Sequence, residues 1–155
     1  MTIPAMRRND RQLSNAQTIA ILERGNHGVL STVDQENQPY GVPVNYVYHQ
    51  GSIYFHCAPE GYKLLNISHQ PQVSFCVIEK ADLIPETFST NYVSAIVFGK
   101  AYIVDGQEKI EALHWLIQHL AENEIEKGDA YIQAQAEFTK VVRIDVQLLT
   151  GKANK

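Results

Sequence analysis

Apolar and polar residues alternate through much of the middle of the chain, in the period-two pattern that is typical of strands with one buried face. Turn-forming residues separate the alternating runs. The alternation is clearest near the C-terminus, where Val142, Ile144, Val146 and Leu148 are interleaved with polar residues. The pattern predicts about six strands, over residues 28–33, 41–48, 52–57, 72–79, 92–104 and 142–148.

The longest of these predicted strands, residues 92–104, carries small apolar residues on one face. That face runs in steps of two from Val93 to Ile103 and includes Gly99. Small side chains on one face of a long strand suit a tightly curved, closed sheet.

Other segments carry apolar residues at helical spacing. Ser14 or Asn15 can cap a first helix that runs to about Arg24. A short helix is predicted over residues 61–68 and a longer one over residues 107–123. Hairpin-length turns join most of the strands, whereas a parallel sheet needs a helix between most of them. We therefore expect a mainly β, α+β fold built around a small antiparallel barrel.

Composition narrows the class of protein. The chain has 155 residues, 45% of them hydrophobic and 19% charged, which suits a single domain spanning residues 1–155. Thirteen Lys and Arg residues against 17 Asp and Glu give a formal net charge of -4, so we expect no nucleic acid as a partner. Residues 1–12, with Arg7, Arg8 and Arg11, form a basic N-terminal arm that is either a solvated tail or packs on a partner subunit.

The chain has neither the apolar run that a membrane span requires nor an apolar signal core at its N-terminus. Its two cysteines, Cys57 and Cys76, are too few for a disulfide framework. We therefore expect a cytoplasmic protein without a membrane partner. We also expect no metal site, because His114 and His119 diverge on their predicted helix and neighbouring strand residues such as His56 and Cys57 point to opposite faces.

The most informative local feature is the turn from a predicted strand into the short helix, with Lys63 in its first turn. A helix N-terminus offers unpaired N–H groups and a positive partial charge, and a lysine adds a full charge. These groups make a plausible seat for a phosphate. The alternative is that Lys63 lies on the solvated face of a surface helix.

Three further residues can carry chemistry. His56 can hydrogen-bond a cofactor or substrate and, with an ordinary pKa near 6.5, can donate a proton; the alternative is a structural histidine. Pro43 interrupts a strand-like run, which predicts an edge strand, a bulge or a place where a flat ligand replaces a neighbouring strand. On the same face, Asn45 offers a donor and an acceptor either to a heterocycle or to nearby backbone.

Three stretches, residues 38–48, 53–67 and 73–77, resemble the pyridoxamine-phosphate-oxidase-like flavin proteins, and within them the 5-nitroimidazole-resistance branch. Residues 94–101 and 149–153 fit the same branch, so the resemblance extends over nearly the whole chain. It implies an FMN-binding split β-barrel with flanking helices, which dimerises and binds FMN at the subunit interface. Some relatives hold FAD instead.

The resemblance also implies site residues. The strand that lines the flavin matches Val42, Pro43, Val44, Asn45, Tyr46 and Val47. The site continues through His56 and Cys57, the phosphate-holding pair matches Tyr62 and Lys63, and Ser94 falls beside the flavin ring. Oxidases of the wider family have cations at four of these positions, and this chain keeps only Lys63, which weakens an assignment as a pyridoxamine-phosphate oxidase.

The activity that the resemblance implies is reduction of a small aromatic substrate, such as a nitroimidazole, through the bound flavin. His56 is the candidate catalytic residue, because a histidine at the matching position is implicated in the activity of that branch. Two alternatives remain open at this point. One is a non-catalytic flavin-binding protein that acts in storage or sensing, and the other is a haem-handling protein.

Overall fold

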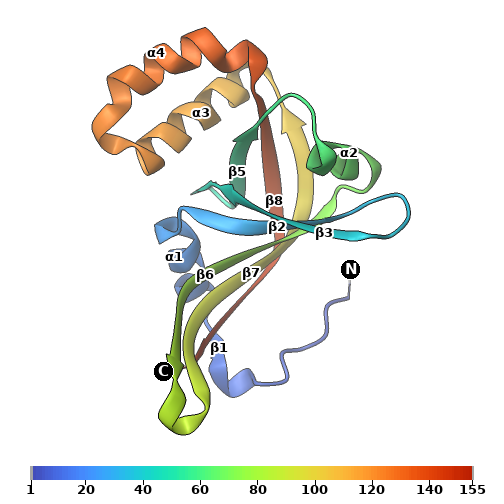
Figure 1. Ribbon diagram of the computed structural model, residues 1–155, viewed down its shortest axis with the longest axis vertical. Coiled ribbons are helices and arrows are strands. Elements are labelled where there is room, and N and C mark those ends of the chain that lie inside the picture. The colour runs from blue at the N-terminus through green and yellow to red at the C-terminus, as the bar shows by residue number, and fades with distance from the viewer. Residues whose placement is uncertain (1, 155) are drawn as a thin grey trace.

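In the computed structural model, which describes residues 2–154, an antiparallel sheet curls into a half-barrel with helices around it (Figure 1). The sheet has eight strands in the order β3-β2-β6-β7-β8-β5-β4, with β1 paired to β8. The strands are β1 (Gln12–Leu13), β2 (His27–Val33), β3 (Pro39–Asn45), β4 (Val47–His49), β5 (Ser52–Cys57), β6 (Gln72–Ile84), β7 (Ser89–Val104) and β8 (Lys140–Asn154). The α-helices are α1 (Asn15–Arg24), α2 (Tyr62–His69), α3 (Gly106–Leu120) and α4 (Ile125–Gln135), and the 3-10 turns are η1 (Asn9–Arg11), η2 (Pro85–Thr87), η3 (Glu122–Glu124) and η4 (Ala136–Phe138).

The predicted strands are confirmed, and the two additional ones are short. The predicted strand at 41–48 divides at Tyr46 into β3 and β4, because the chain leaves β2 there and pairs with β5 instead. β1 forms where the basic arm ends and pairs with β8. β3 lies at one edge of the sheet, which confirms the edge-strand interpretation of Pro43.

The predicted helices are confirmed, and one helix was missed. Ser14 caps α1 through a reciprocal capping box with Gln17, in which each side chain bonds the other residue's backbone N–H. The predicted helix at 107–123 ends earlier, at Leu120, and α4 follows it as an antiparallel partner. No helix in residues 2–154 combines the length and the apolarity needed to cross a bilayer.

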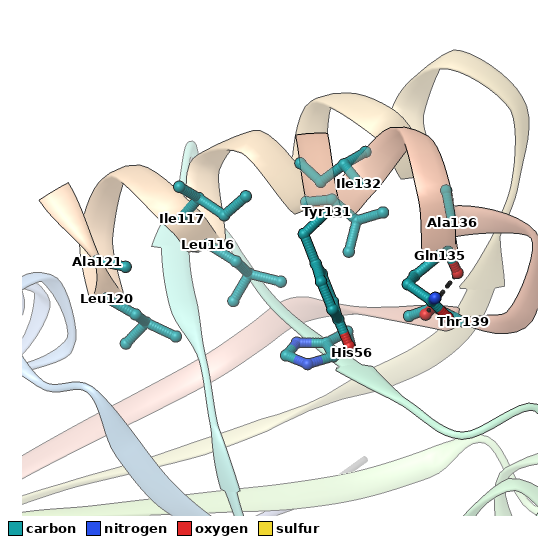
Figure 2. A pocket seen from close by; sticks show the side chains of 11 residues that line it. His56, Leu116, Ile117, Leu120, Ala121, Tyr131, Ile132, Gln135, Ala136 and Thr139 are labelled. Atoms are coloured by element: carbon teal, nitrogen blue, oxygen red, sulfur yellow. Dashed lines mark hydrogen bonds between the residues drawn. The ribbon is translucent and has the colours of Figure 1, made fainter. Parts of the chain in front are cut away.

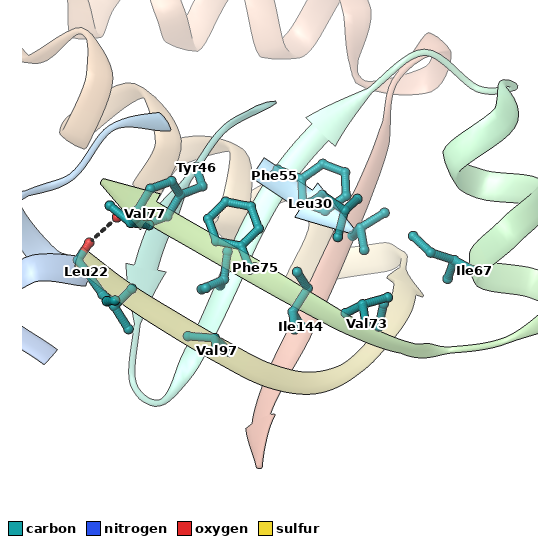
Figure 3. Packing of buried hydrophobic residues seen from close by; sticks show 14 of the residues in the cluster. Leu22, Leu30, Tyr46, Phe55, Ile67, Val73, Phe75, Val77, Val97 and Ile144 are labelled. Carbon is teal, nitrogen blue, oxygen red and sulfur yellow. Dashed lines mark hydrogen bonds between the residues drawn. The ribbon is translucent and has the colours of Figure 1, made fainter. Parts of the chain in front are cut away.

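The main core fills the half-barrel (Figure 3). Leu30, Phe55 and Phe75 are fully buried in it. Tyr46 is also fully buried, with its ring edge-on to Phe75 and its hydroxyl donating to the Leu22 carbonyl over 2.8 Å. This bond satisfies a buried polar group and ties the break between β3 and β4 to α1.

A β-bulge changes which residues of β8 face the core. Phe98 pairs with Leu148 and Gly99 with Val146, so Gln147 is an extra residue on β8. The expectation that Leu148 shares the buried face is therefore wrong: it is 39% exposed, and Leu149 packs inward in its place. Beyond the bulge the inward-facing positions of β8 are odd-numbered, with Leu149 packed on the core and Gly151 buried.

The apolar face predicted for β7 also ends early. It is buried from Ala95 through Ala101, but Ile103 is exposed and Val104 is buried instead. The last part of β7 packs under α3 rather than inside the barrel, and Val104 belongs to that second cluster. The expectation that Ile103 belongs to the same buried face is wrong for this reason.

The convex side of the sheet carries an exposed apolar surface, which we call the outer face and define by Val29, Ile78, Ile96 and Leu148. Val29 and Ile96 both lie opposite Cys76 in the strand register, and the other two lie in the adjoining rows. Exposed apolar residues clustered across neighbouring strands mark a binding surface more often than an ordinary solvated one.

A second core cluster joins the other side of β5 and β8 to the α3–α4 hairpin. Tyr54 and Val141 contribute from the sheet, and Leu116 and Ile132 from the two helices. Gly128 allows the helices to approach closely, because a Cβ there would lie 2.6 Å from the side chain of Ile117.

Gly128→Val should therefore destabilise the protein by about 1 to 3 kcal/mol, the usual cost of overpacking a close contact. Chemical denaturation followed by circular dichroism would measure the change in the free energy of unfolding. Ala130→Val, at an exposed position of the same helix, is the matched control. Equal free energies for the two variants would contradict the close-contact explanation.

Candidate functional site

The N-terminus of α2 forms an open cradle of backbone donors. Gly61 precedes the helix with φ of +147°, a conformation that L side chains rarely adopt, and the space beside its Cα is open. The Gly61 carbonyl accepts from Leu64 and Leu65, so the N–H groups of Tyr62 and Lys63 precede the first intrahelical bond. The first turn contains no acidic residue. The cradle therefore has the polarity that an anion requires.

Lys63 is half-buried at this cradle and lies near the end of β5. Burial raises the pKa of the Cys57 thiol, and the positive charge of Lys63 opposes that rise. The two side chains thus influence one another electrostatically, as the sequence-based site requires. Because its pKa is raised, Cys57 stays a neutral thiol at neutral pH.

The side chain of Tyr62 is engaged with other residues of the chain, so only its backbone is open to a phosphate. Its hydroxyl donates to Asp34 Oδ2 over 2.6 Å, and its ring centroid lies 4.7 Å from that of Tyr40. The hydrogen bond from Tyr62 also holds the pKa of the Asp34 carboxyl below its usual value. With its proton engaged by Asp34, Tyr62 can offer a phosphate its backbone N–H, while its side chain ties α2 to the β2–β3 turn.

The predicted flavin-lining strand alternates in exposure. Pro43 and Asn45 are exposed, while Val42 and Val44 are half-buried against the barrel core. The Asn45 side-chain N–H group donates to the Asn26 carbonyl over 3.1 Å, which leaves its amide oxygen as an acceptor. From β3, the groups open to a ligand are therefore the Pro43 ring and the Asn45 amide.

The last two residues of that stretch are core residues. The side chains of Tyr46 and Val47 are buried, the first in the barrel and the second in the cluster under α3. Only their backbone groups can line a ligand. This part of the stretch therefore shapes the site by holding β3 beside β5.

His56 lies on the other side of β5 from the barrel. Phe55 and Cys57 pack with the barrel core, whereas Tyr54 packs with the cluster under α3, so the predicted division of the strand faces is confirmed. His56 follows Tyr54 on that side and reaches the α3–α4 hairpin (Figure 2). Although the imidazole is open to solvent, the protein around it disfavours its charged form and lowers its pKa from 6.5. It is therefore mainly neutral at pH 7.

A cavity of about 180 Å³ lies between β5 and the α3–α4 hairpin, and we call it the α3–α4 cavity. Tyr131 and Ile132 of α4 line it together with the aliphatic side of α3, and His56 lines it from the sheet (Figure 2). The sequence-based site lacked this cavity because α4 was missed. The spacing of Ile125, Gly128 and Ile132 on one helical face was the signal that could have found it.

Ser94 does not join the other predicted residues in a single chain. It lies on the convex side of β7, opposite Ile78 on β6 and Lys152 on β8. This position is next to the outer face, in the half of β7 that leads to the β6–β7 hairpin (Figure 1). The structure thus brings together Cys57, Tyr62 and Lys63, places His56 on the opposite face of β5, and leaves Ser94 apart.

Two of the other histidines, His114 and His119, link separate elements. His119 contacts the Gly25 carbonyl over 2.6 Å, and His114 lies 2.9 Å from the Asp129 carboxylate, joining α3 to α4. Within residues 2–154, no cluster of three or more His, Cys, Asp or Glu side chains is arranged to hold a metal ion.

The family model described as pyridoxamine 5'-phosphate oxidase matches residues 14–153, so the chain belongs to the pyridoxamine 5'-phosphate oxidase family. No curated protein sequence matches it. Among solved structures, a candidate 5-nitroimidazole antibiotic resistance protein from Bacteroides thetaiotaomicron is similar with a TM-score of 0.80 and 23% identity, over 91% of this chain and 85% of that one.

Two other similar structures widen the range of cofactors among the neighbours. A FAD-binding protein from Mesorhizobium loti has a TM-score of 0.67 and 22% identity, over 94% of this chain and 98% of that one. A FAD and heme binding protein from Mycobacterium smegmatis has a TM-score of 0.81 and 14% identity, over 94% and 74% of the two chains. At these identities the similarity establishes the shared split-barrel fold.

Proposed function

We propose that this protein is a cytoplasmic, homodimeric oxidoreductase that binds FMN at its subunit interface and uses it to reduce a small aromatic substrate. The observation that carries the proposal is the cradle at the start of α2, where the first turn holds Lys63 and the N–H groups of Tyr62 and Lys63 precede the first intrahelical bond. Family membership and the fold support the same cofactor class.

The groups present fit a phosphate ester. The donors of the cradle are two N–H groups and one ammonium, and no acidic side chain lies in the first helical turn. Glu60 is the nearest carboxylate along the chain, and it is exposed in the preceding turn. Lys63 and the N–H groups of Tyr62 and Lys63 would hold the phosphate. A single such cradle suits FMN, and FAD is the alternative that the Mesorhizobium neighbour supports.

The outer face supports the dimer. Its four apolar residues lie on β2, β6, β7 and β8, and Ser94 and Lys152 lie beside it. A second copy packed there would cover the apolar surface and would place Ser94 at the subunit interface.

The chemistry divides between the cofactor and the chain. Bound flavin would supply the electron transfer, while the protein orients the cofactor and the substrate and excludes water from them. Pro43 and Asn45 present an apolar ring and an amide oxygen from β3, and His56 presents an imidazole N–H from β5. In this arrangement His56 is the group that can give a proton to a reduced substrate.

His56→Ala should slow substrate reduction by about a hundredfold at pH values where the wild-type imidazole is protonated, the lower end of the usual contribution of a general acid. Because the protein around His56 lowers its pKa below 6.5, the protonated donor is lost as the pH rises through that lowered value. The wild-type rate should therefore fall toward neutral pH, and the variant's rate should stay flat. If the variant instead loses its flavin, His56 supports the cofactor rather than the reaction.

The reductase activity itself is tested by mixing the purified protein with reduced nicotinamide and a 5-nitroimidazole and following loss of the nitro-group absorbance. We expect a rate well above that of the same concentration of free FMN. A rate equal to that of free FMN would contradict the proposed activity and leave a flavin-binding protein that acts in storage or sensing.

Haem handling is a second candidate, favoured by the similarity to the Mycobacterium smegmatis FAD and heme binding protein. Titration with haemin distinguishes it. A Soret band that saturates at one haem per chain and survives gel filtration would favour haem handling over nitro reduction.

A further inference from the structure

Apart from His56, the residues that line the α3–α4 cavity have no role in the proposed reaction. Its lining is mostly apolar, with one wall from α3 made by Leu113, Leu116, Ile117 and Leu120. Tyr131 and Ile132 of α4 form the facing wall (Figure 2). The two helices approach closely where Gly128 faces Ile117, and the His114–Asp129 pair also links them. The cavity is thus a built feature of the hairpin rather than a gap between loose elements.

The charge of the lining restricts what can bind. No Lys, Arg, Asp or Glu side chain lines the cavity in the described part of the chain. Moving a charged group from water into such a place without a partner costs several kcal/mol. The occupant is therefore uncharged in the part that enters the cavity.

The size of the cavity restricts the occupant further. An engineered apolar protein cavity of about 150 Å³ binds benzene. At about 180 Å³, the α3–α4 cavity accommodates one ring with a small substituent. The three fused rings of a flavin, or a haem, exceed that space, so the cavity is not the seat of the cofactor.

The polar side chains of the lining are those of His56, Tyr131, Gln135 and Thr139. The hydroxyl of Thr139 donates to the backbone carbonyl of Gln135 over 3.0 Å, so its proton is engaged. The His56 imidazole makes no hydrogen bond within residues 2–154, and desolvation by the surrounding protein is the cause of its lowered pKa. A neutral imidazole has one donor and one acceptor, and both are available to an occupant's polar substituent.

We propose that the α3–α4 cavity binds an uncharged, single-ring aromatic molecule and that His56 contacts its polar substituent. The ring packs between α3 and α4, and the size of Ala136 at the edge of the cavity limits how large it can be. That the bound molecule is the electron acceptor rests on the proposed function. The binding itself is a property of this cavity and does not depend on a flavin.

Two nitroaromatic probes of matched shape test the chemical class. Para-nitrotoluene and para-nitrobenzoate share a ring and a nitro group but differ in charge. Equilibrium dialysis against the purified full chain, with and without added FMN, gives their dissociation constants. Trp115, the only tryptophan of the sequence, packs against the cluster that contains Leu113 and Leu116, so quenching of its fluorescence reports binding at the cavity.

Ala136→Leu fills the cavity from its edge, and Ala134→Leu makes the same change at an exposed, non-lining position of α4. We expect wild type and Ala134→Leu to bind para-nitrotoluene equally, and Ala136→Leu to bind it about tenfold or more weakly, because the added side chain occupies the ring's space. We expect para-nitrobenzoate to bind at least about tenfold more weakly than para-nitrotoluene. Leu120→Phe, which fills the cavity from α3, should repeat the loss if Ala136→Leu folds poorly by circular dichroism.

Equal binding of para-nitrotoluene to the wild type and to both filling variants would overturn the cavity as the site. Equal affinity for the two probes would overturn the uncharged class. FMN titrations of the same variants separate these failures from failure of the proposed function, since Ala136→Leu leaves the α2 cradle unchanged. A chain that binds no FMN but loses para-nitrotoluene binding on Ala136→Leu supports the cavity and contradicts the oxidoreductase.

Discussion

Lys63→Ala should weaken the binding of FMN by about 1.5 to 3 kcal/mol, the contribution of a charge-assisted hydrogen bond. The lysine is the one full positive charge in the first turn of α2, and it lies half-buried near the end of β5. Removing it leaves the backbone N–H groups of the cradle to hold the phosphate. Titration of the apoprotein with FMN, followed by quenching of flavin fluorescence, gives the dissociation constants.

Lys127→Ala is the matched control for this measurement. It removes an equal charge from an exposed position of α4, at the opposite side of the sheet from α2 (Figure 1). Its FMN affinity should equal that of the wild type. An affinity unchanged in Lys63→Ala would place the phosphate elsewhere.

Ile96→Asp should convert the proposed homodimer into a monomer and reduce flavin binding with it. Ile96 lies at the centre of the outer face and is 38% exposed in a single chain. Packing a second copy there would bury the new carboxylate without a partner, at a cost of several kcal/mol. Light scattering after gel filtration would measure the molar mass of the wild type and of Ile96→Asp, and flavin content would be read from the same peak.

Ile110→Asp is the control for that change, because Ile110 is also 38% exposed but lies on α3. We expect it to remain dimeric and to retain flavin. A monomeric wild type that binds flavin fully would contradict the interface site, as would a dimeric Ile96→Asp.

Local sequence patterns predicted much of the architecture because they act over a few residues. Alternation placed the strands, Ser14 marked the start of α1, and Pro43 indicated an edge strand. The bulge at Gln147 was not predictable in the same way. The apolar alternation from Val142 to Leu148 continues across the bulge, so the sequence carries no sign of it. Its position is set by pairing between β7 and β8. Its effect is to expose Leu148 on the outer face.

In the candidate site too, features set by a few neighbouring residues were predictable, and features set by contacts between distant segments were not. The spacing of Lys63 after Gly61 was enough to indicate an anion cradle, because all of its donors come from one short segment. The α3–α4 cavity depends instead on α4, whose apolar face is narrow and is interrupted by Gly128. The protein around His56 disfavours its charged form and lowers its pKa, so reasoning from its ordinary value overstated the protonated fraction at neutral pH.

The absorption spectrum of the purified protein, followed by mass analysis of the small molecule that it releases on denaturation, tests the central claim most directly. We expect the two visible bands of an oxidised flavin and a released molecule with the mass of FMN. A protein that shows no flavin bands after incubation with excess FMN and FAD and gel filtration would contradict flavin binding and the function built on it.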